Sequence, residues 1–314
     1  MKRQWLYSVL VAAFVASFGT WISLSWAADA GSKADYRETM QKQVKITFDG
    51  RETAIYHYGE ALDKPYFHPL WTPDRRIVTY DSPADHVHHR GLCVGWPDVS
   101  GNDFWAEIWS PAGKQGKIVS QEAEVHPQAD GSITLVDKNE WRGEYGTVWV
   151  AGEFSWTLLP PRENLQRVDV RIRLTARQPE VIFGSDSPPR EYHGLTLRIG
   201  PFTEPRYFNA LGDEGGQNCK GKAARWCAVS GRQSGKPVLV ALMDSPENVE
   251  TPAQFYVQDQ GMQFVSTSPN MGRAKVLNQG ETWELTYRVI AAGEPPTGHS
   301  WDLQALWREF AEGK

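Results

Sequence analysis

RVDVRIRLTA, residues 167–176, alternates strictly between apolar and polar side chains. Successive side chains of a β-strand point to opposite faces, so this segment has one aliphatic face and one charged face. The aliphatic face carries Val168, Val170, Ile172 and Leu174, and the charged face carries Arg167, Asp169, Arg171 and Arg173. The pattern predicts a strand with one face on a core and the other in solvent.

Similar segments recur along the chain, at residues 44–48, 76–80, 117–125, 132–136, 147–159, 195–200, 236–244, 253–259, 262–267 and 283–292. Turn-forming pairs separate several of them, at Asp49-Gly50, Asp130-Gly131, Ser230-Gly231 and Gln279-Gly280. Many short strands without helical crossovers predict an all-β fold, a large antiparallel β-sandwich. Because no linker-like stretch or repeat interrupts them, residues 29–314 are expected to form a single sandwich domain.

One helix is expected, at the end of the chain. In residues 300–310, SWDLQALWREF, the apolar side chains follow the helical spacing at Leu303, Leu306, Trp307 and Phe310. Ser300 is a candidate N-cap. The apolar face is expected to pack on the sandwich.

The first residues have the features of a secretory signal. Lys2 and Arg3 precede an apolar stretch that runs to about Ile22, and small residues follow at Ser25, Ala27, Ala28 and Ala30. This order predicts a signal peptide over residues 1–28 and a periplasmic or secreted protein. An uncleaved membrane anchor is the alternative, because the apolar stretch is nearly long enough to span a bilayer. No later segment is apolar enough to cross a membrane.

Composition limits the range of partners. The chain has 314 residues, a net charge of −5 and no run of Lys or Arg that would follow a phosphate backbone, so no nucleic-acid partner is expected. It also has 14 Trp residues. Indole rings stack on flat apolar faces, including those of sugar rings, so this content is compatible with a carbohydrate site as well as with core packing.

Three cysteines are present, at Cys93, Cys219 and Cys227. The last two flank CKGKAARWC, a short loop that a hairpin could close, and a disulfide between them is one expectation. Cys93 lies in the apolar stretch GLCVGW and is expected to be buried.

Residues 85–91, DHVHHRG, place three of the eight histidines within four positions, followed by Arg90. If the segment is extended, His86, His88 and Arg90 share one face while His89 points away. His86 and His88 could then bind one divalent transition metal ion. The candidate further ligands are His68, His193, Glu191, Asp103, Asp213 and Glu214, with Asp85 as a partner that orients a ring.

Acid–base chemistry is the competing interpretation, because imidazole titrates near working pH and an adjacent arginine can hold a substrate oxygen. The candidate catalytic residues are His88, His89, Arg90, His193 and Glu191. The candidate substrate-binding residues are Trp96, Trp105, Asp103, Asp213, Glu214 and His68. Each also has a structural alternative: hydrogen bonding in a turn for the histidines, core packing for the tryptophans, and a solvated turn for the acidic pair.

Several stretches together resemble a known family: HPLWTPDRRIVTYDSPADHVHHRGLCVGWPDVSGNDFW, REYHGLTLRIG, KAARWCAVSG, VLVALMDSPENVETPAQFYVQD and LNQGETWELTYRVIAAGEPP. They are similar to secreted bacterial proteins often labelled methane oxygenase of the PmoA type, otherwise a domain of unknown function. The resemblance implies a β-sandwich close to the supersandwich of galactose mutarotases and polysaccharide lyases, whose concave sheet binds sugars. Methane oxygenase activity is not expected, because the membrane subunit of that name is a multi-span helical protein.

Three hypotheses follow, in order of preference. The first is a carbohydrate-active enzyme, a hydrolase, lyase or epimerase, that uses the histidines for proton transfer on a sugar or another polar small molecule. The second is a metal-dependent hydrolase or oxidoreductase built on the H-x-H pair. The third is a non-catalytic glycan-binding protein that depends on the tryptophans.

Overall fold

The computed structural model describes residues 33–40, 42–84, 86–107, 114–184, 191–296 and 300–313. Residues 31–314 form one compact unit. The expected signal peptide, residues 1–28, lies outside the described residues, and so does Asp85. None of the helices in the described ranges is long and apolar enough to cross a membrane.

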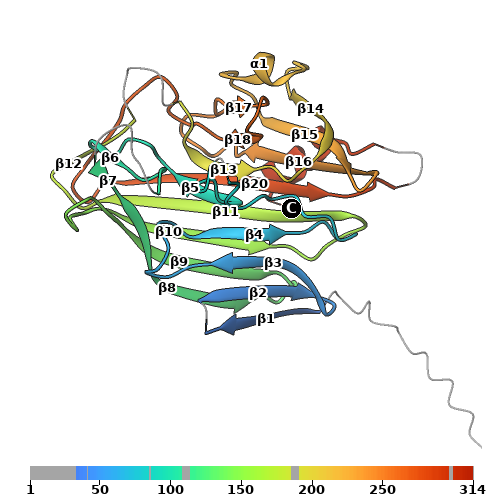
Figure 1. The fold of residues 1–314 in the computed structure, drawn as a ribbon, viewed down its shortest axis with the longest axis horizontal. Helices are drawn as coiled ribbons and strands as arrows, with labels where there is room; N and C mark the ends of the chain where they lie inside the picture. Colours follow the sequence, from blue (N-terminus) through green and yellow to red (C-terminus); the bar gives the residue numbers. More distant parts are fainter. Residues whose placement is uncertain are drawn as a thin grey trace, which may run out of the picture. The chain divides into compact units, whose positions relative to one another are not determined.

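Two antiparallel sheets of eight strands each build the fold (Figure 1). The first, called sheet I here, has the order β1 (Ala34–Thr39), β2 (Gln43–Phe48), β3 (Arg51–His57), β4 (Tyr66–Leu70), β5 (Leu92–Gly95), β13 (Gly194–Arg198), β18 (Phe264–Ser266) and β17 (Tyr256–Gln258). Its two halves come from opposite ends of the sequence, and they meet where β5 pairs with β13. The loops before and after β5 therefore lie over the later strands.

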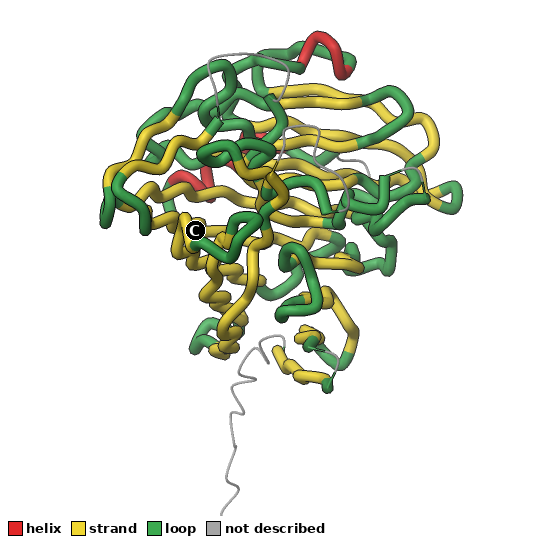
Figure 2. The backbone as a smooth tube through the Cα atoms, turned by 60° about the vertical axis from the view of Figure 1, so that its left-hand side comes forward, coloured by secondary structure: helices red, strands yellow, loops and turns green. Residues whose placement is uncertain are grey.

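The second, called sheet II here, has the order β14 (Thr203–Asn209), β15 (Trp226–Gln233), β16 (Lys236–Asp244), β20 (Thr282–Ala292), β11 (Leu165–Ala176), β10 (Val148–Leu158), β9 (Ile133–Arg142) and β8 (Lys117–Pro127). Two small ladders, β12 (Glu180–Phe183) with β19 (Lys275–Asn278) and β6 (Asn102–Asp103) with β7 (Lys114–Gln115), complete the strands. The helices are α1 (Gly216–Cys219) and α2 (Leu303–Ala311), drawn in red in Figure 2. The expected all-β antiparallel sandwich with a short C-terminal helix is confirmed.

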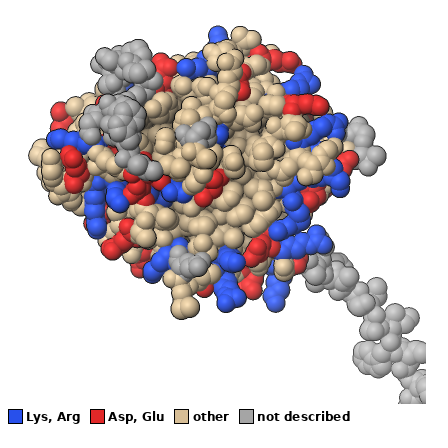
Figure 3. Space-filling view, viewed as in Figure 1, with Lys and Arg blue, Asp and Glu red and all other residues tan. Residues whose placement is uncertain are grey.

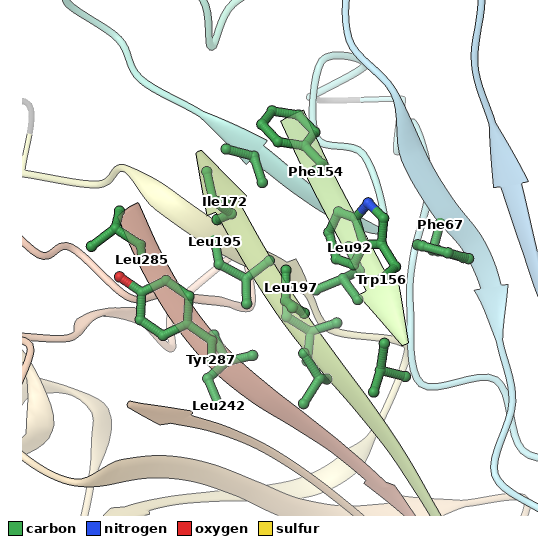
Figure 4. Packing of buried hydrophobic residues seen from close by; sticks show 14 of the residues in the cluster. Phe67, Leu92, Phe154, Trp156, Ile172, Leu195, Leu197, Leu242, Leu285 and Tyr287 are labelled. Carbon is green, nitrogen blue, oxygen red and sulfur yellow. The ribbon is translucent and has the colours of Figure 1, made fainter. Parts of the chain in front are cut away.

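The core lies between the two sheets. Phe154, Ile172 and Leu285 point from sheet II toward side chains of sheet I such as Leu92 and Leu195, as Figure 4 shows. All five are buried completely or nearly so. Ile172 and its aliphatic neighbours in residues 167–176 therefore lie in the core, as the alternation predicts.

The charged face of β11 is not solvated along its whole length. Arg171 is exposed and pairs with Glu284, whereas Arg167 is buried. The reason is α2, which packs Leu303 and Leu306 on the outer face of sheet II. The helix covers this end of the sheet, and this tertiary contact cannot be predicted from the alternation of β11 alone.

Three local predictions differ from the structure. The N-cap of α2 is Asp302, whose side chain accepts a hydrogen bond from Ala305 N, and not Ser300. The turn expected at Ser230-Gly231 lies instead at Ser234-Gly235, between β15 and β16. Gly231 lies inside β15, where a Cβ atom would come within 2.9 Å of Thr203 O. Residues 76–80 form isolated bridges instead of a strand.

One buried polar group connects the sheets. The Asp137 carboxylate, on β9, accepts hydrogen bonds from the Tyr56 hydroxyl of β3 at 3.0 Å and from Ser120 of β8. Asn139 donates to its other oxygen at 2.9 Å. Burial raises the pKa of Asp137, and these donors compensate part of that cost.

Candidate functional site

The histidine segment is a tight turn between β4 and β5. His86 N donates to Pro83 O at 2.9 Å, His89 N donates to His86 O at 2.9 Å, and Ser82 N donates to His89 O at 3.0 Å. The segment is therefore not extended, and His89 does not point away from His86 and His88. The turn gathers the three rings, with centroids 5.8 Å apart for His86 and His88, 5.1 Å for His86 and His89, and 4.7 Å for His88 and His89.

The three rings form one wall of a pocket with a volume of about 230 Å³. Its other lining residues are Asp103, Trp105, Ala106, Tyr192, Tyr256, Gln258, Met262 and Phe264. The pocket lies on the outer face of sheet I, because Tyr256, Gln258 and Phe264 alternate with Val257 and Val265, which belong to the core. We call it the histidine pocket.

Aromatic rings line another part of the same pocket, next to the histidines. Trp105 lies 4.9 Å from Tyr192, and Tyr256 stacks on Phe264 at 5.5 Å, measured between ring centroids. His89 contacts two of these aromatic rings, with its ring 5.8 Å from that of Trp105 and 5.2 Å from that of Phe264, edge to face in each case. The pocket thus places flat apolar surfaces against imidazole nitrogens.

The environment of the histidines disfavours their charged forms. Burial, followed by the charge of Lys64, lowers the pKa of His88 to about 4. Burial, followed by His88 and Arg198, lowers the pKa of His89 to about 2. Near neutral pH both rings are therefore neutral, and a neutral imidazole can accept a proton or a hydrogen bond.

A buried ion cluster supports the pocket from behind. Glu107 accepts hydrogen bonds from Arg90 Nε at 2.9 Å and Nη2 at 2.6 Å, and it lies 2.9 Å from the ammonium group of Lys64. Burial alone would raise the pKa of Glu107, but Lys64 and Arg90 hold it below its ordinary value. Lys64 also donates to Trp105 O at 2.7 Å, so the cluster connects the histidine turn to the aromatic wall.

Arg90 belongs to this cluster and is not a lining residue of the histidine pocket. Its guanidinium group lies 5.2 Å from the centre of the Tyr66 ring and pairs with Asp81 at 3.3 Å. Through these contacts Arg90 stabilises the turn that carries the histidines.

The other predicted site residues divide between the pocket and its surroundings. Asp103 and Trp105 line the histidine pocket together with the three histidines. Asp103 accepts hydrogen bonds from Trp105 N and Ala106 N at 2.8 and 2.9 Å, which shapes the turn that presents the indole ring. Trp96 and His193 lie beneath the surface, stacked on each other at 5.5 Å, and both are buried.

Glu191, His68, Asp213 and Glu214 are not among the residues that line the histidine pocket. Glu191 is half-buried and lies 4.0 Å from the ammonium group of Lys220. His68, on β4, contacts Thr79 Oγ1 through Nδ1 at 2.9 Å. Asp213 and Glu214 precede α1, where Asp213 accepts from Asn209 and Glu214 pairs with Arg206 at 3.5 Å.

A complete set of metal ligands is not present among the described residues. In the part of the chain that the structure describes, no group of three or more His, Cys, Asp or Glu side chains is arranged to hold a metal ion. His86 and His88 therefore have no third ligand among these residues, and the second-ranked hypothesis gains no geometric support.

Sequence reasoning missed half of the pocket. Tyr192 lies between the two candidate residues Glu191 and His193, and residues 191–193 precede β13 and direct Tyr192 to the pocket. Tyr256 and Phe264 were overlooked although the alternation in YVQ and FVS separates them from the core valines. Lys64 and Glu107 had no sequence signal, because they are 43 positions apart in sequence and meet only in the fold.

Fold and site together define an all-β sandwich protein with a pocket of histidine and aromatic side chains on the outer face of one sheet. The chain belongs to a family of unknown function, DUF6807, whose model matches residues 43–307. The match covers every residue of the histidine pocket. No curated protein matches the chain.

Proposed function

We propose that this protein is a carbohydrate-active enzyme that binds a single sugar ring in the histidine pocket and moves a proton on it. The observation that carries the proposal is that His86, His88 and His89 line one small pocket together with a cluster of aromatic side chains that includes Trp105 and Tyr192. Aromatic faces pack against the C–H faces of a ring, and neutral imidazoles accept from its hydroxyl groups.

The size of the pocket favours a small ligand. About 230 Å³ lies below the range of roughly 300–1,000 Å³ that is typical of pockets for drug-sized molecules. A single ring fits this volume better than an extended glycan. The substrate class we propose is therefore a monosaccharide, or the terminal residue of a longer chain.

The polar side chains that line the pocket favour proton transfer over a hydrolysis that uses two carboxylates. Asp103 is the one carboxylate among the described lining residues, whereas most glycoside hydrolases place two acidic residues across the bond they cleave. His88 is the proposed base, because it lines the pocket and its imidazole is neutral near pH 7 and so has a free nitrogen lone pair. An epimerase or lyase reaction uses such a group directly. The proposal also includes a relationship to the galactose-mutarotase-like supersandwich proteins and export from the cytoplasm.

The test is a proton-exchange assay on the purified chain from residue 29 onward. Aldohexoses and methyl glycosides, incubated with the protein in D₂O, are followed by proton NMR for anomer interconversion, solvent deuterium at carbon, and elimination products. We expect one of these changes with wild type, and its loss in His88→Asn. The control is His126→Asn, because His126 is exposed on β8 and pairs with Glu124.

Two results would overturn the proposal. Turnover that is equal in wild type and His88→Asn would remove the histidine from the chemistry. Saturable sugar binding without turnover, dependent on Trp105, would favour the glycan-binding alternative, whose ligand uses the same pocket.

A further inference from the structure

We propose that Cys219 and Cys227 are joined by a disulfide bond in the folded protein, and that this bond holds one wall of the histidine pocket. The three cysteines of the chain are buried, and all have free thiols in the structure. The proposal concerns the oxidised form of the same fold. It stands apart from the proposed sugar chemistry, because it would hold for any ligand.

The fold places the two thiols together. Cys219 is the last residue of α1, and its Sγ contacts Asp213 O at 3.5 Å. The same carbonyl oxygen accepts a hydrogen bond from Asn209 N at 3.2 Å, and Asn209 is the residue directly opposite Cys227 in the β14–β15 ladder. Both cysteines belong to the same buried core cluster. The proximity of the two thiols lowers the pKa of Cys219 and raises that of Cys227.

The third cysteine, Cys93, is not placed to form a disulfide with either Cys219 or Cys227. It lies on β5 between its partners Tyr66 of β4 and Thr196 of β13. Burial raises the pKa of its thiol to about 11, so it is a poor nucleophile for thiol exchange.

The segment that the disulfide would close lies along the pocket wall. Gly221 N donates to Phe255 O at 2.8 Å, Phe255 N donates to Lys222 O at 3.2 Å, and Ala224 N donates to Ala253 O at 3.1 Å. These bonds attach residues 220–224 to the stretch that enters β17. Lys220, directly after Cys219, places its ammonium group 4.3 Å from the centre of the Tyr256 ring, which lines the pocket.

A bond between Cys219 and Cys227 would therefore fix Lys220 against Tyr256 from behind. In its formation the two thiols lose two protons and two electrons, and one S–S bond forms. The electron acceptor is the disulfide of a thiol–disulfide oxidoreductase or of oxidised glutathione, which becomes two thiols. Because both sulfurs are buried in the native state, the bond forms during folding, before the core closes.

The first test is a thiol map of the wild-type chain from residue 29 onward, folded in a glutathione redox buffer. Free thiols are alkylated in denaturant without reduction, and the protein is digested and analysed by mass spectrometry. We expect label on Cys93 alone and a linked peptide pair that contains Cys219 and Cys227. Label on all three cysteines would overturn the disulfide, and the experiment needs no variant and no ligand.

The second test is hydrogen–deuterium exchange before and after reduction with a phosphine. We expect exchange at residues 219–224 and 253–259 to become about tenfold faster on reduction, and exchange in β9 and β10 to stay unchanged. A Cys219→Ser/Cys227→Ser variant should match the reduced protein, and Cys93→Ser should match the oxidised one. Equal exchange in the oxidised and reduced forms would overturn the role of the bond in holding the pocket wall.

Discussion

The ammonium group of Lys64 lies 2.9 Å from a carboxylate oxygen of Glu107, and the two side chains are only 2% and 6% exposed. A pair this deeply buried costs much desolvation free energy, and the hydrogen bonds from Arg90 to Glu107 and from Lys64 to Trp105 O offset that cost. The pair belongs to the loops that carry the histidine pocket, so its integrity controls both stability and pocket shape.

Glu107→Gln should destabilise the fold by about 3–5 kcal/mol, because it leaves the Lys64 charge buried without its counterion. The free energy of unfolding is measured by urea denaturation at pH 7. The matched control is Asp63→Asn, which removes the partner of Lys117, a half-exposed lysine, and should cost about 0–1 kcal/mol. Similar losses in the two variants would contradict the stabilising role of the buried pair.

Stability should fall as the pH falls below the ordinary pKa of histidine, and His89 should account for part of this loss. The native pKa of His89 is about 2, whereas in the unfolded chain it is about 6.5. Below pH 6.5 the unfolded state therefore binds a proton that the native state does not, so acidification favours unfolding. Between pH 7 and pH 5 this one group removes up to about 2 kcal/mol.

His89→Phe keeps a flat ring at this position and removes the titration. Its unfolding free energy should change less between pH 7 and pH 5 than that of wild type, as measured by urea denaturation at each pH. His126→Asn, at an exposed histidine, is the control and should follow the wild-type profile. Parallel profiles for wild type and His89→Phe would show that His89 is not held neutral by burial.

Tyr56→Phe should cost about 1 kcal/mol or somewhat more, because the Tyr56 hydroxyl donates to the buried Asp137 carboxylate across the two sheets. Ser120 and Asn139 continue to bond the carboxylate in the variant, which limits the loss. The measurement is again urea denaturation, with Tyr145→Phe as control because Tyr145 is 82% exposed. A loss no larger than that of the control would mean that this hydrogen bond between the sheets makes no net contribution to stability.

The sandwich could be predicted because its signal is local. Alternation of the kind seen in β11 reports which face of a strand is buried, and most of the expected strands are present. The exceptions come from tertiary contacts. Arg167 is buried because α2 covers it, and Gly231 is a strand residue because the backbone of Thr203 passes close to it.

The candidate site was predictable only on its histidine side. His86, His88 and His89 stand out because they cluster in sequence, and the turn then brings their rings together. The aromatic wall comes from β17, β18 and the segment before β13, which follow the histidines by about a hundred residues or more. Their approach depends on the pairing of β5 with β13, and a local sequence pattern does not specify that pairing.

Trp105→Ala and His88→Asn should affect a sugar substrate in different ways, if the histidine pocket holds the sugar ring. Trp105 has no titratable group and can only contribute packing or a hydrogen bond, so its loss should remove binding that is equal in the ground state and the transition state. KM should then rise by about tenfold or more, equivalent to about 1.4 kcal/mol, with a smaller change in kcat.

His88→Asn should instead lower kcat by about 10²–10⁴-fold and leave KM nearly unchanged, because the amide cannot take up the proton that the neutral imidazole accepts. The measurement is steady-state kinetics with the aldohexose or glycoside that shows turnover in the NMR assay. Tyr145→Ala, at an exposed turn residue, should leave both constants at their wild-type values. If both variants lost kcat alone, the indole ring would belong to the chemical step, and the division of the pocket into a binding wall and a proton-transfer wall would be wrong.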